Sequence, residues 1–369
     1  MSAGTEGQRV VYLHIGTPKS GTTYLQTRFE VNQDRAGQQG LFWPGPRWGE
    51  HVEAVRDLRT LKGKRLDPAG PWMRLVDSIR AAPGPRALIS MEWMSGFTPT
   101  EVEVAVRSLA PARVEVICTC RDLLRTFVAQ WQEMTKNCRP WSWQQFVDEM
   151  LSRDGGAASL QFWRQQDVPK ILERWASSVP LDQIHLVTLP RRGADPEVLW
   201  HRFCSILGID GSGFEQPPSV NESLGVVSAN LMRRANLVAI DQSMDRIQYQ
   251  RVLHRRLADS ILAPHRDQEA SIAVSPDVDR WIRDQAEQQI QAIARLGARL
   301  VGDLEELVPG EPLTGRDPSD VSDSELLELS VEAMVKLAMD LYEANRRLRE
   351  QNRRLREGAG RSANRGLDG

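Results

Sequence analysis

Short apolar segments alternate with amphipathic segments over residues 9–208 of the chain. Four runs, at 9–15, 87–91, 114–119 and 184–189, are apolar at nearly every position, which predicts strands buried on both faces. Between them, apolar residues recur at the 3.6-residue spacing of helices. The predicted helices cover 22–31, 51–62, 71–81, 98–109, 123–136, 143–151, 168–177 and 197–207. We expect a turn over 16–21 and a loop over 37–50. This alternation predicts an α/β fold, in which helices cover both faces of a central parallel sheet.

The second half of the chain follows a different pattern. It is almost wholly helical over 223–307, so we expect this part to pack on the core, residues 1–222, rather than to extend its sheet. A polar linker follows over 308–323, with two prolines and two glycines in its first half. We expect a coiled-coil helix over 324–357 and a disordered tail over 358–369.

The coiled-coil prediction depends on a heptad seam, in which core residues recur at alternating spacings of four and three. The seam consists of Leu327, Val331, Met334, Ala338, Leu341, Asn345, Leu348, Asn352 and Leu355. Two interpretations stay open: a two-stranded coiled coil that makes a homodimer, or a single amphipathic helix docked on the body. We favour the homodimer, because the arginine-rich half over 346–356 has too few apolar residues for a broad docking face.

Composition excludes several classes of protein. The 369 residues carry 47 basic and 49 acidic side chains, and this balance argues against a nucleic-acid partner. We expect no membrane span, because no stretch of about 18 apolar residues occurs. The first eight residues lack the apolar core of a signal peptide, and four cysteines do not make a disulfide framework, so we expect a cytoplasmic location. Cys118 and Cys120 are interpreted as small buried residues, since no further ligands complete a metal site.

The strongest chemical signal is the segment Ile15–Thr23, which follows a buried strand and opens a helix. Gly16 and Gly21 allow close backbone approach, and the helix N-terminus offers unpaired N–H groups to an anion. The glycine spacing is that of a Walker A loop, but Thr22 stands where the Walker lysine belongs. The cation, Lys19, is three residues earlier, on the loop itself.

Residues 11–26, VYLHIGTPKSGTTYLQ, closely resemble the 5′-phosphosulfate loop of sulfotransferases that use 3′-phosphoadenosine 5′-phosphosulfate (PAPS). By its layout over 9–307, the chain resembles the bacterial sulfotransferase-family proteins. The resemblance implies a P-loop-like three-layer α/β/α fold and PAPS as the sulfuryl donor. It also implies that Lys19 stabilises charge on the leaving oxygen. The donor-binding residues of the loop would be Thr17, Pro18, Lys19, Ser20, Gly21, Thr22 and Thr23.

The second family motif is an arginine followed eight residues later by a serine, both of which bind the 3′-phosphate. Arg121 stands at the arginine position, just past the strand 114–119, and its guanidinium suits a phosphate. The serine position is occupied by Ala129, which removes a hydroxyl donor. Arg125 or Thr126, nearby on the following helix, are candidates to compensate.

Sulfuryl transfer to a hydroxyl or amine needs a base for the acceptor proton, and no metal is required if lysine and backbone donors supply positive potential. Glu92 is the first candidate, because it follows the run 87–91 and a parallel sheet binds its ligands at the carboxyl ends of strands. His51 is the second, at the start of a helix after the Trp- and Gly-rich segment 42–49.

Three functions stay open at this point. The first is a PAPS-dependent sulfotransferase acting on a carbohydrate or small metabolite. The second is a P-loop phosphotransferase using Mg²⁺, which predicts the lysine that is absent after Gly21. The third is a non-catalytic scaffold, favoured only by Ala129. The acceptor cannot be read from the sequence.

Overall fold

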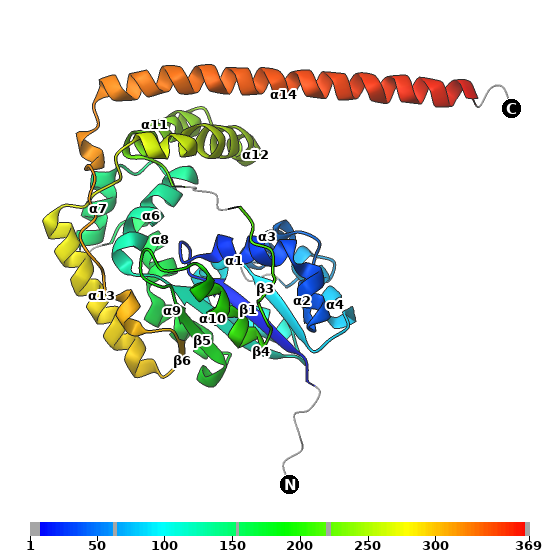
Figure 1. The fold of residues 1–369 in the computed structure, drawn as a ribbon, viewed down its shortest axis with the longest axis vertical. Coiled ribbons are helices and arrows are strands. Elements are labelled where there is room, and N and C mark those ends of the chain that lie inside the picture. The colour runs from blue at the N-terminus through cyan, green and yellow to red at the C-terminus, as the bar shows by residue number, and fades with distance from the viewer. Residues whose placement is uncertain (1–7, 62–64, 153–154, 219–222, 366–369) are drawn as a thin grey trace, which may run out of the picture. The chain divides into compact units, whose positions relative to one another are not determined.

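The computed structural model describes residues 8–61, 65–152, 155–218 and 223–365 (Figure 1). The chain forms two compact units. Unit 1 comprises 1–130, 146–220 and 274–313, and unit 2 comprises 131–145, 221–273 and 314–369. The segment Gly16–Thr23 and all of the sheet belong to unit 1.

The centre of unit 1 is a parallel sheet whose strand order is β2-β3-β1-β4-β5-β6 in the described residues. The strands are β1 (Val10–Gly16), β2 (Leu41–Phe42), β3 (Arg86–Ser90), β4 (Arg113–Cys120), β5 (Ile184–Thr188) and β6 (Arg299–Val301). Strand β1 lies between β3 and β4, with His14 beside Ser90 on one side and Gly16 beside Cys118 on the other. The strand that carries the loop therefore occupies the middle of the sheet, and the predicted α/β fold is confirmed.

Two short edge strands depart from the prediction. β6 pairs with β5 through His185 and Arg299, so the segment 223–307 does extend the sheet. β2 lies inside the segment 37–50, which was predicted to be a loop, and pairs with β3. Strands of two or three residues are too short to produce a readable alternation, and Arg299 and Leu300 are exposed.

Helices cover both faces of the sheet in unit 1, as Figure 1 shows. Side chains of β1 alternate between two apolar clusters, with Leu13 in one and Tyr12 in the other. One cluster includes α3 (Trp48–Arg59), α4 (Pro71–Ala81), α5 (Pro99–Ser108), α9 (Val168–Ala176) and α13 (Pro276–Leu296). The other includes α1 (Thr22–Val31), α2 (Gln33–Gln38) and α10 (Glu197–Leu207).

Helix ends follow from local signals. Thr98 and Glu101 form a capping box at the start of α5, and Gly208 ends α10 in the left-handed conformation, with φ 63°. The start of α3 at Trp48 is three residues earlier than predicted. Helices α2 and α8 (Ala157–Gln166) were not predicted. Helices α6 (Leu123–Lys136) and α7 (Trp143–Leu151) have their predicted bounds.

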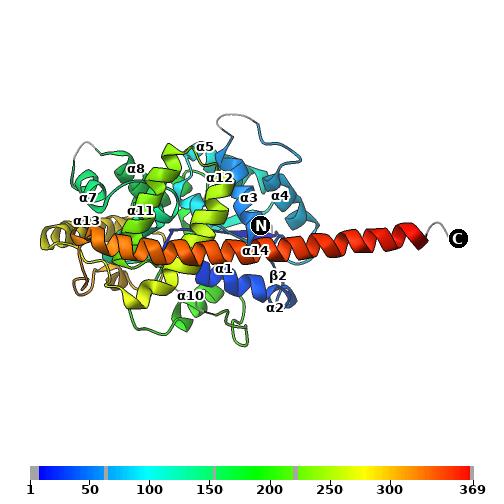
Figure 2. The same cartoon turned by 90° about the horizontal axis from the view of Figure 1, so that it is seen from above.

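Unit 2 is helical in its described residues. It contains α11 (Val226–Asp241), α12 (Arg246–Tyr249), a π-helical segment (Gln250–Leu262) and α14 (Asp323–Arg365). Helix α14 packs against α11 and the π-helical segment, and it crosses α11 in the view of Figure 2. It ends at Arg365, so the tail predicted to be disordered from Gly358 begins as helix, and 366–369 lie outside the described residues. No described helix has an apolar stretch of the length that a bilayer span needs.

Candidate functional site

The segment that follows β1 forms a tight turn into α1. Gly16 has a φ of 100° and Gly21 one of 79°, both in the region that favours glycine. A Cβ at Gly16 would lie 2.8 Å from the Cβ of Glu92, so a larger residue does not fit there. Gly21 is the N-cap of α1 and has no side-chain cap, so the first N–H groups of the helix stay available to an anion.

The turn is fixed by hydrogen bonds to two other elements. The Thr17 N–H donates to the carbonyl oxygen of Thr119 at the end of β4, at 2.6 Å. From α8, the Gln166 side-chain amide donates to the Pro18 carbonyl at 2.9 Å. The Ser20 hydroxyl, fully buried, donates to the Thr17 carbonyl at 2.5 Å. Of the predicted donor-binding residues, Ser20 therefore offers its backbone rather than its side chain to a ligand.

A chain of buried polar groups runs beneath the turn through His14. Its Nδ1 lies 2.7 Å from the Ser90 hydroxyl and its Nε2 lies 3.2 Å from the Thr119 hydroxyl, which is 2.6 Å from that of Ser20. Since Ser20 donates onward to Thr17, a neutral His14 with its proton on Nε2 satisfies every member of the chain. Burial lowers the pKa of His14 from 6.5 to about 3, which agrees with a neutral ring.

The other predicted loop residues differ in their exposure to solvent. Lys19 is half-buried and precedes the start of α1 by three residues. Its backbone has a positive φ of 65°. Thr22 is buried and Thr23 is exposed, so these two adjacent hydroxyls have different access to solvent. Thr17 and Pro18 are buried. The loop therefore presents Lys19, Thr23 and the N-terminus of α1 at the carboxyl edge of the sheet.

Glu92 lies beside this loop. It lies just beyond β3, as the first residue of a 3₁₀ turn (η1, Glu92–Gly96). It packs so closely against Gly16 that a Cβ there would lie 2.8 Å from the Cβ of Glu92. The side-chain amide of Gln26, on α1, donates to its Oε2 at 2.9 Å. The half-buried carboxylate is thus oriented by the same helix that begins at the loop. The fold brings the first candidate base to the predicted anion site.

His51, the second candidate base, has a structural position instead. It is fully buried, stacks on Trp43 at 4.4 Å, and receives a hydrogen bond on Nδ1 from the Ser90 N–H at 3.1 Å. Its Nε2 donates to the Pro44 carbonyl at 2.7 Å. Burial lowers its pKa from 6.5 to about 4. With both nitrogens bonded to the backbone, His51 does not fit the role of a base that receives an acceptor proton.

Arg121 is the first residue after β4, at the same edge of the sheet as the loop. Burial, followed by the nearby charge of Arg125, lowers the pKa of Arg121 to about 10, although Asp122 opposes this shift. Its Nε is buried and has no hydrogen-bond partner among the described residues. This Nε lies 4.0 Å from Oδ2 of Asp122, an ion pair without a hydrogen bond, so the guanidinium keeps the capacity to bind an anion.

Arg125, predicted to assist, is already engaged. Its Nε and its backbone N–H both donate to the Asp122 carboxylate, which therefore starts helix α6. Thr126, by contrast, has a buried hydroxyl without a hydrogen-bond partner in the part of the chain that the structure describes. Thr126 lies three residues, or about one turn, before Ala129 on α6. It is the better placed of the two to replace the missing serine.

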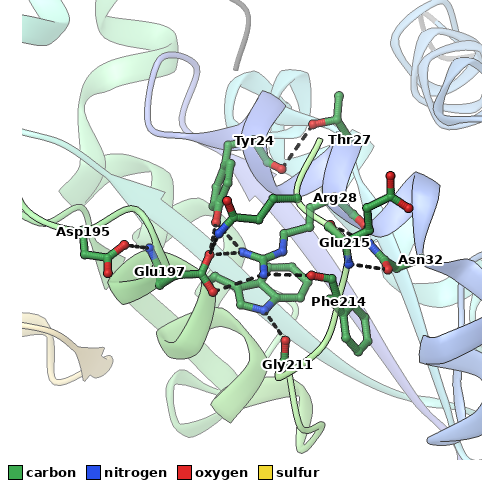
Figure 3. Close-up of polar contacts among 11 residues, drawn as sticks. Tyr24, Thr27, Arg28, Asn32, Asp195, Glu197, Gly211, Phe214 and Glu215 are labelled. Atoms are coloured by element: carbon green, nitrogen blue, oxygen red, sulfur yellow. Dashed lines mark hydrogen bonds and ion pairs between the residues drawn. The ribbon is translucent and has the colours of Figure 1, made fainter. Parts of the chain in front are cut away.

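Helix α1 is held at its far end by a buried ion pair with α10, shown in Figure 3. Arg28 donates from both terminal nitrogens to Glu197, with a distance of 3.1 Å to Oε2, and its guanidinium lies 4.2 Å from the centre of the Trp200 ring. Tyr24 also donates to Glu197, at 3.0 Å. The hydrogen bond from Arg28 holds the pKa of Glu197 below its usual range. This contact fixes the helix whose N-terminus forms the loop.

A second group of charged residues lies away from the loop, toward the amino ends of the strands. There, a depression of about 640 Å³ is lined by Tyr12, Arg113, Glu115, His185 and Arg299, among others. Glu115 and His185 are 2.9 Å apart. No three metal-ligating side chains come together anywhere in the described residues.

Comparison with known proteins finds matches among solved structures alone. No family model matches the chain, and no curated protein matches it. A sulfotransferase from Alicyclobacillus acidocaldarius is similar in structure, with 13% identity, a TM-score of 0.38, and coverage of 66% of this chain and 95% of that one. The sulfotransferase domain from the curacin biosynthetic pathway has 13% identity, a TM-score of 0.33, and coverage of 79% and 98%. At these values the functional assignment has to come from the chain's own residues.

Proposed function

We propose that the chain is a sulfotransferase that moves a sulfuryl group from PAPS to a hydroxyl or amine of a carbohydrate or small metabolite. The observation that carries the proposal is the loop Gly16–Thr23, with its cation ahead of the second glycine. It lies at the carboxyl end of the central strand and beside Glu92. The resemblance of residues 11–26 to the 5′-phosphosulfate loop of this family supports the choice of donor.

In the proposed reaction, Glu92 accepts the proton of the acceptor group. The acceptor oxygen or nitrogen forms a bond to sulfur while the bond between sulfur and the phosphate oxygen of the donor breaks. Lys19 and the N-terminal N–H groups of α1 stabilise the negative charge on that leaving oxygen. Gln26 holds the carboxylate of Glu92 toward the loop throughout.

Arg121 would bind the 3′-phosphate of the donor. Its buried Nε, without a hydrogen-bond partner in the described residues, supports this assignment, as does its position just beyond β4. The hydroxyl of Thr126 would supply the contact that Ala129 cannot make. Arg125, committed to Asp122, would contribute charge rather than a direct hydrogen bond.

The phosphotransferase alternative is less well supported. It requires a carboxylate at a strand end to hold Mg²⁺. Asp122 follows β4, but its carboxylate accepts hydrogen bonds from Arg125 and caps α6. The scaffold alternative requires a loop that no longer binds nucleotide, which the following experiment tests directly.

Calorimetric titration with 3′-phosphoadenosine 5′-phosphate separates the three functions. We expect binding by the wild-type chain and an affinity reduced by roughly tenfold to a hundredfold in Lys19→Ala, since one hydrogen bond to a charged group contributes about 1.5–3 kcal/mol. Lys170→Ala, which removes an exposed lysine paired with Asp167, is the matched control and should bind like wild type. Tighter binding of ATP with Mg²⁺ would favour the phosphotransferase, and absence of any nucleotide binding would favour the scaffold.

A second titration tests Arg121. Adenosine 5′-phosphate lacks the 3′-phosphate, so Arg121→Met should weaken binding of the 3′-phosphorylated nucleotide and leave that of adenosine 5′-phosphate nearly unchanged. Equal losses for both ligands would mean that Arg121 does not bind the 3′-phosphate.

A further inference from the structure

The heptad seam of α14 is exposed along its described length. Leu327, Met334 and Leu348 are 65%, 63% and 59% exposed, and Val331 and Leu341 are exposed as well. A row of large apolar side chains at four-and-three spacing is the pattern of a helix that packs against another helix. Nothing else in the described residues of unit 2 covers this row.

A different face of α14 packs on the other helices of unit 2. Leu326 and Ala333 are buried, at 6% and 3% exposure, and Leu337 and Ala344 continue the same column half-buried. The His265 ring, 3.0 Å from Glu332, reinforces this contact. The docked-helix interpretation therefore accounts for the inner column and leaves the seam unexplained.

We propose that the seam of α14 binds the seam of a second copy of this chain, as a parallel, in-register, two-stranded coiled coil. The occupant follows from Asn345 and Asn352, which fall at one core position of the heptad. In a parallel pair of identical helices each asparagine faces its own counterpart, and the two amides can hydrogen-bond to each other. Against an apolar partner, or in an antiparallel pair, each amide would face an apolar side chain.

The residues that flank the seam agree with the parallel arrangement. Val335 and Tyr342, in the half of α14 that lies on unit 2, are exposed and apolar, whereas the equivalent position one heptad later is Arg349. In a parallel pair this flanking column lies against the partner's column that contains Leu337. The apolar part of one flanking column therefore lies against the partner's column where that column contains Leu337, and a charge replaces it farther along.

The charge pattern gives the dimer a distinctive salt dependence. Residues 344–356 carry six arginines and one glutamate. A parallel pair places the two basic halves side by side, so added salt should tighten the dimer by screening their repulsion. An antiparallel pair would place each basic half beside the acidic residues 323–343 and would weaken with salt.

Sedimentation velocity on the full-length chain tests the proposal. We expect twice the mass of one chain for wild type and the mass of a single chain for the double variant Leu341→Asp, Leu348→Asp. Two buried carboxylates should raise the dissociation constant of the dimer by at least about a hundredfold. Both side chains are exposed in the single chain, so folding should be unaffected. Met339→Asp is the matched control, because Met339 is also exposed but lies off the seam, and it should remain dimeric.

The register is tested by disulfide cross-linking of Asn345→Cys in a Cys138→Ser background. We expect cross-linked dimers between equivalent positions and tighter association at higher salt. A wild-type chain that stays single at micromolar concentration would overturn the proposal, as would a double variant that stays dimeric. Cross-linking only when Asn345→Cys chains are mixed with Leu341→Cys chains would overturn the parallel register.

Discussion

Two of the buried histidines of unit 1, His14 and His51, make the stability of the fold sensitive to mild acid. Burial lowers the pKa of His14 from 6.5 to about 3 and that of His51 from 6.5 to about 4. In the unfolded chain both rings take up a proton near pH 6.5, whereas in the folded chain both stay neutral to much lower pH. The unfolded state therefore binds more protons than the folded state below pH 6.5, and the free energy of unfolding decreases as the pH is lowered.

The size of the effect follows from the two shifts. Each histidine removes about 1.4 kcal/mol from the free energy of unfolding for each pH unit below its unfolded pKa, until the folded pKa is reached. Between about pH 7 and about pH 5, the two together should lower the free energy of unfolding by roughly 3.5 kcal/mol. Glu115 does not contribute in this window. Burial raises its pKa, but the His185 hydrogen bond and Arg113 hold it below 4.5, so its contribution is lost only in stronger acid.

Urea unfolding followed by tryptophan fluorescence at several pH values measures this dependence, and hydrogen exchange of peptides 10–16 and 86–90 assigns it to unit 1. His51→Gln should be less stable than wild type near pH 7 but should lose only about half as much stability on acidification. His201→Gln, which removes an exposed histidine, is the control and should follow wild type. The reasoning would be refuted by a His51→Gln chain with the full wild-type slope.

The remaining predictions concern the site and its support. Lys19→Ala should lower turnover by at least about a hundredfold, the scale of one lost transition-state donor, and near-normal turnover would remove Lys19 from the mechanism. Glu92→Gln should lower the rate much more than donor affinity, measured by steady-state kinetics and titration, and unchanged kinetics would mean that another group is the base. Arg28→Met should destabilise unit 1 by about 3 kcal/mol in urea unfolding, because it leaves the largely buried carboxylate of Glu197 without its charged partner. Gly16→Ala should weaken nucleotide binding, since its Cβ would meet the Cβ of Glu92, and unaltered affinity would contradict the tight packing inferred there.

The parts of the fold that could be predicted from sequence have strong local signals. The bounds of α1 were predicted as they are, because a glycine turn precedes the helix and an apolar stripe runs through it. Helix α10 ends at Gly208 for an equally local reason, its left-handed backbone. β6 could not be found in this way, since only its hydrogen bonds to a strand 114 residues earlier, as in the pair His185 and Arg299, make it a strand.

The same division holds for the candidate site. Glu92 could be placed near the loop because the carboxyl ends of parallel strands share one edge of the sheet. Gln166 could not, because its contact with Pro18 is made by a helix that no periodicity indicated. His51 was misjudged for a related reason: the sequence shows that it lies near a helix start, but not that Trp43 and two backbone groups enclose it.

The arrangement of charge around the loop bears on the scaffold alternative. The groups that hold the loop in place are neutral: an amide from Gln166, the hydroxyl of Ser20 and the unprotonated ring of His14. The positive charge at this edge of the sheet is therefore not needed to build the loop. Arg121 nevertheless keeps a buried Nε without a hydrogen-bond partner in the described residues, at a cost that its lowered pKa reflects. A fold that no longer bound an anion would be more stable with an apolar residue there, so Arg121→Met should raise the stability of the ligand-free chain while weakening nucleotide binding. A variant that lost stability without ligand would show instead that Arg121 serves the fold.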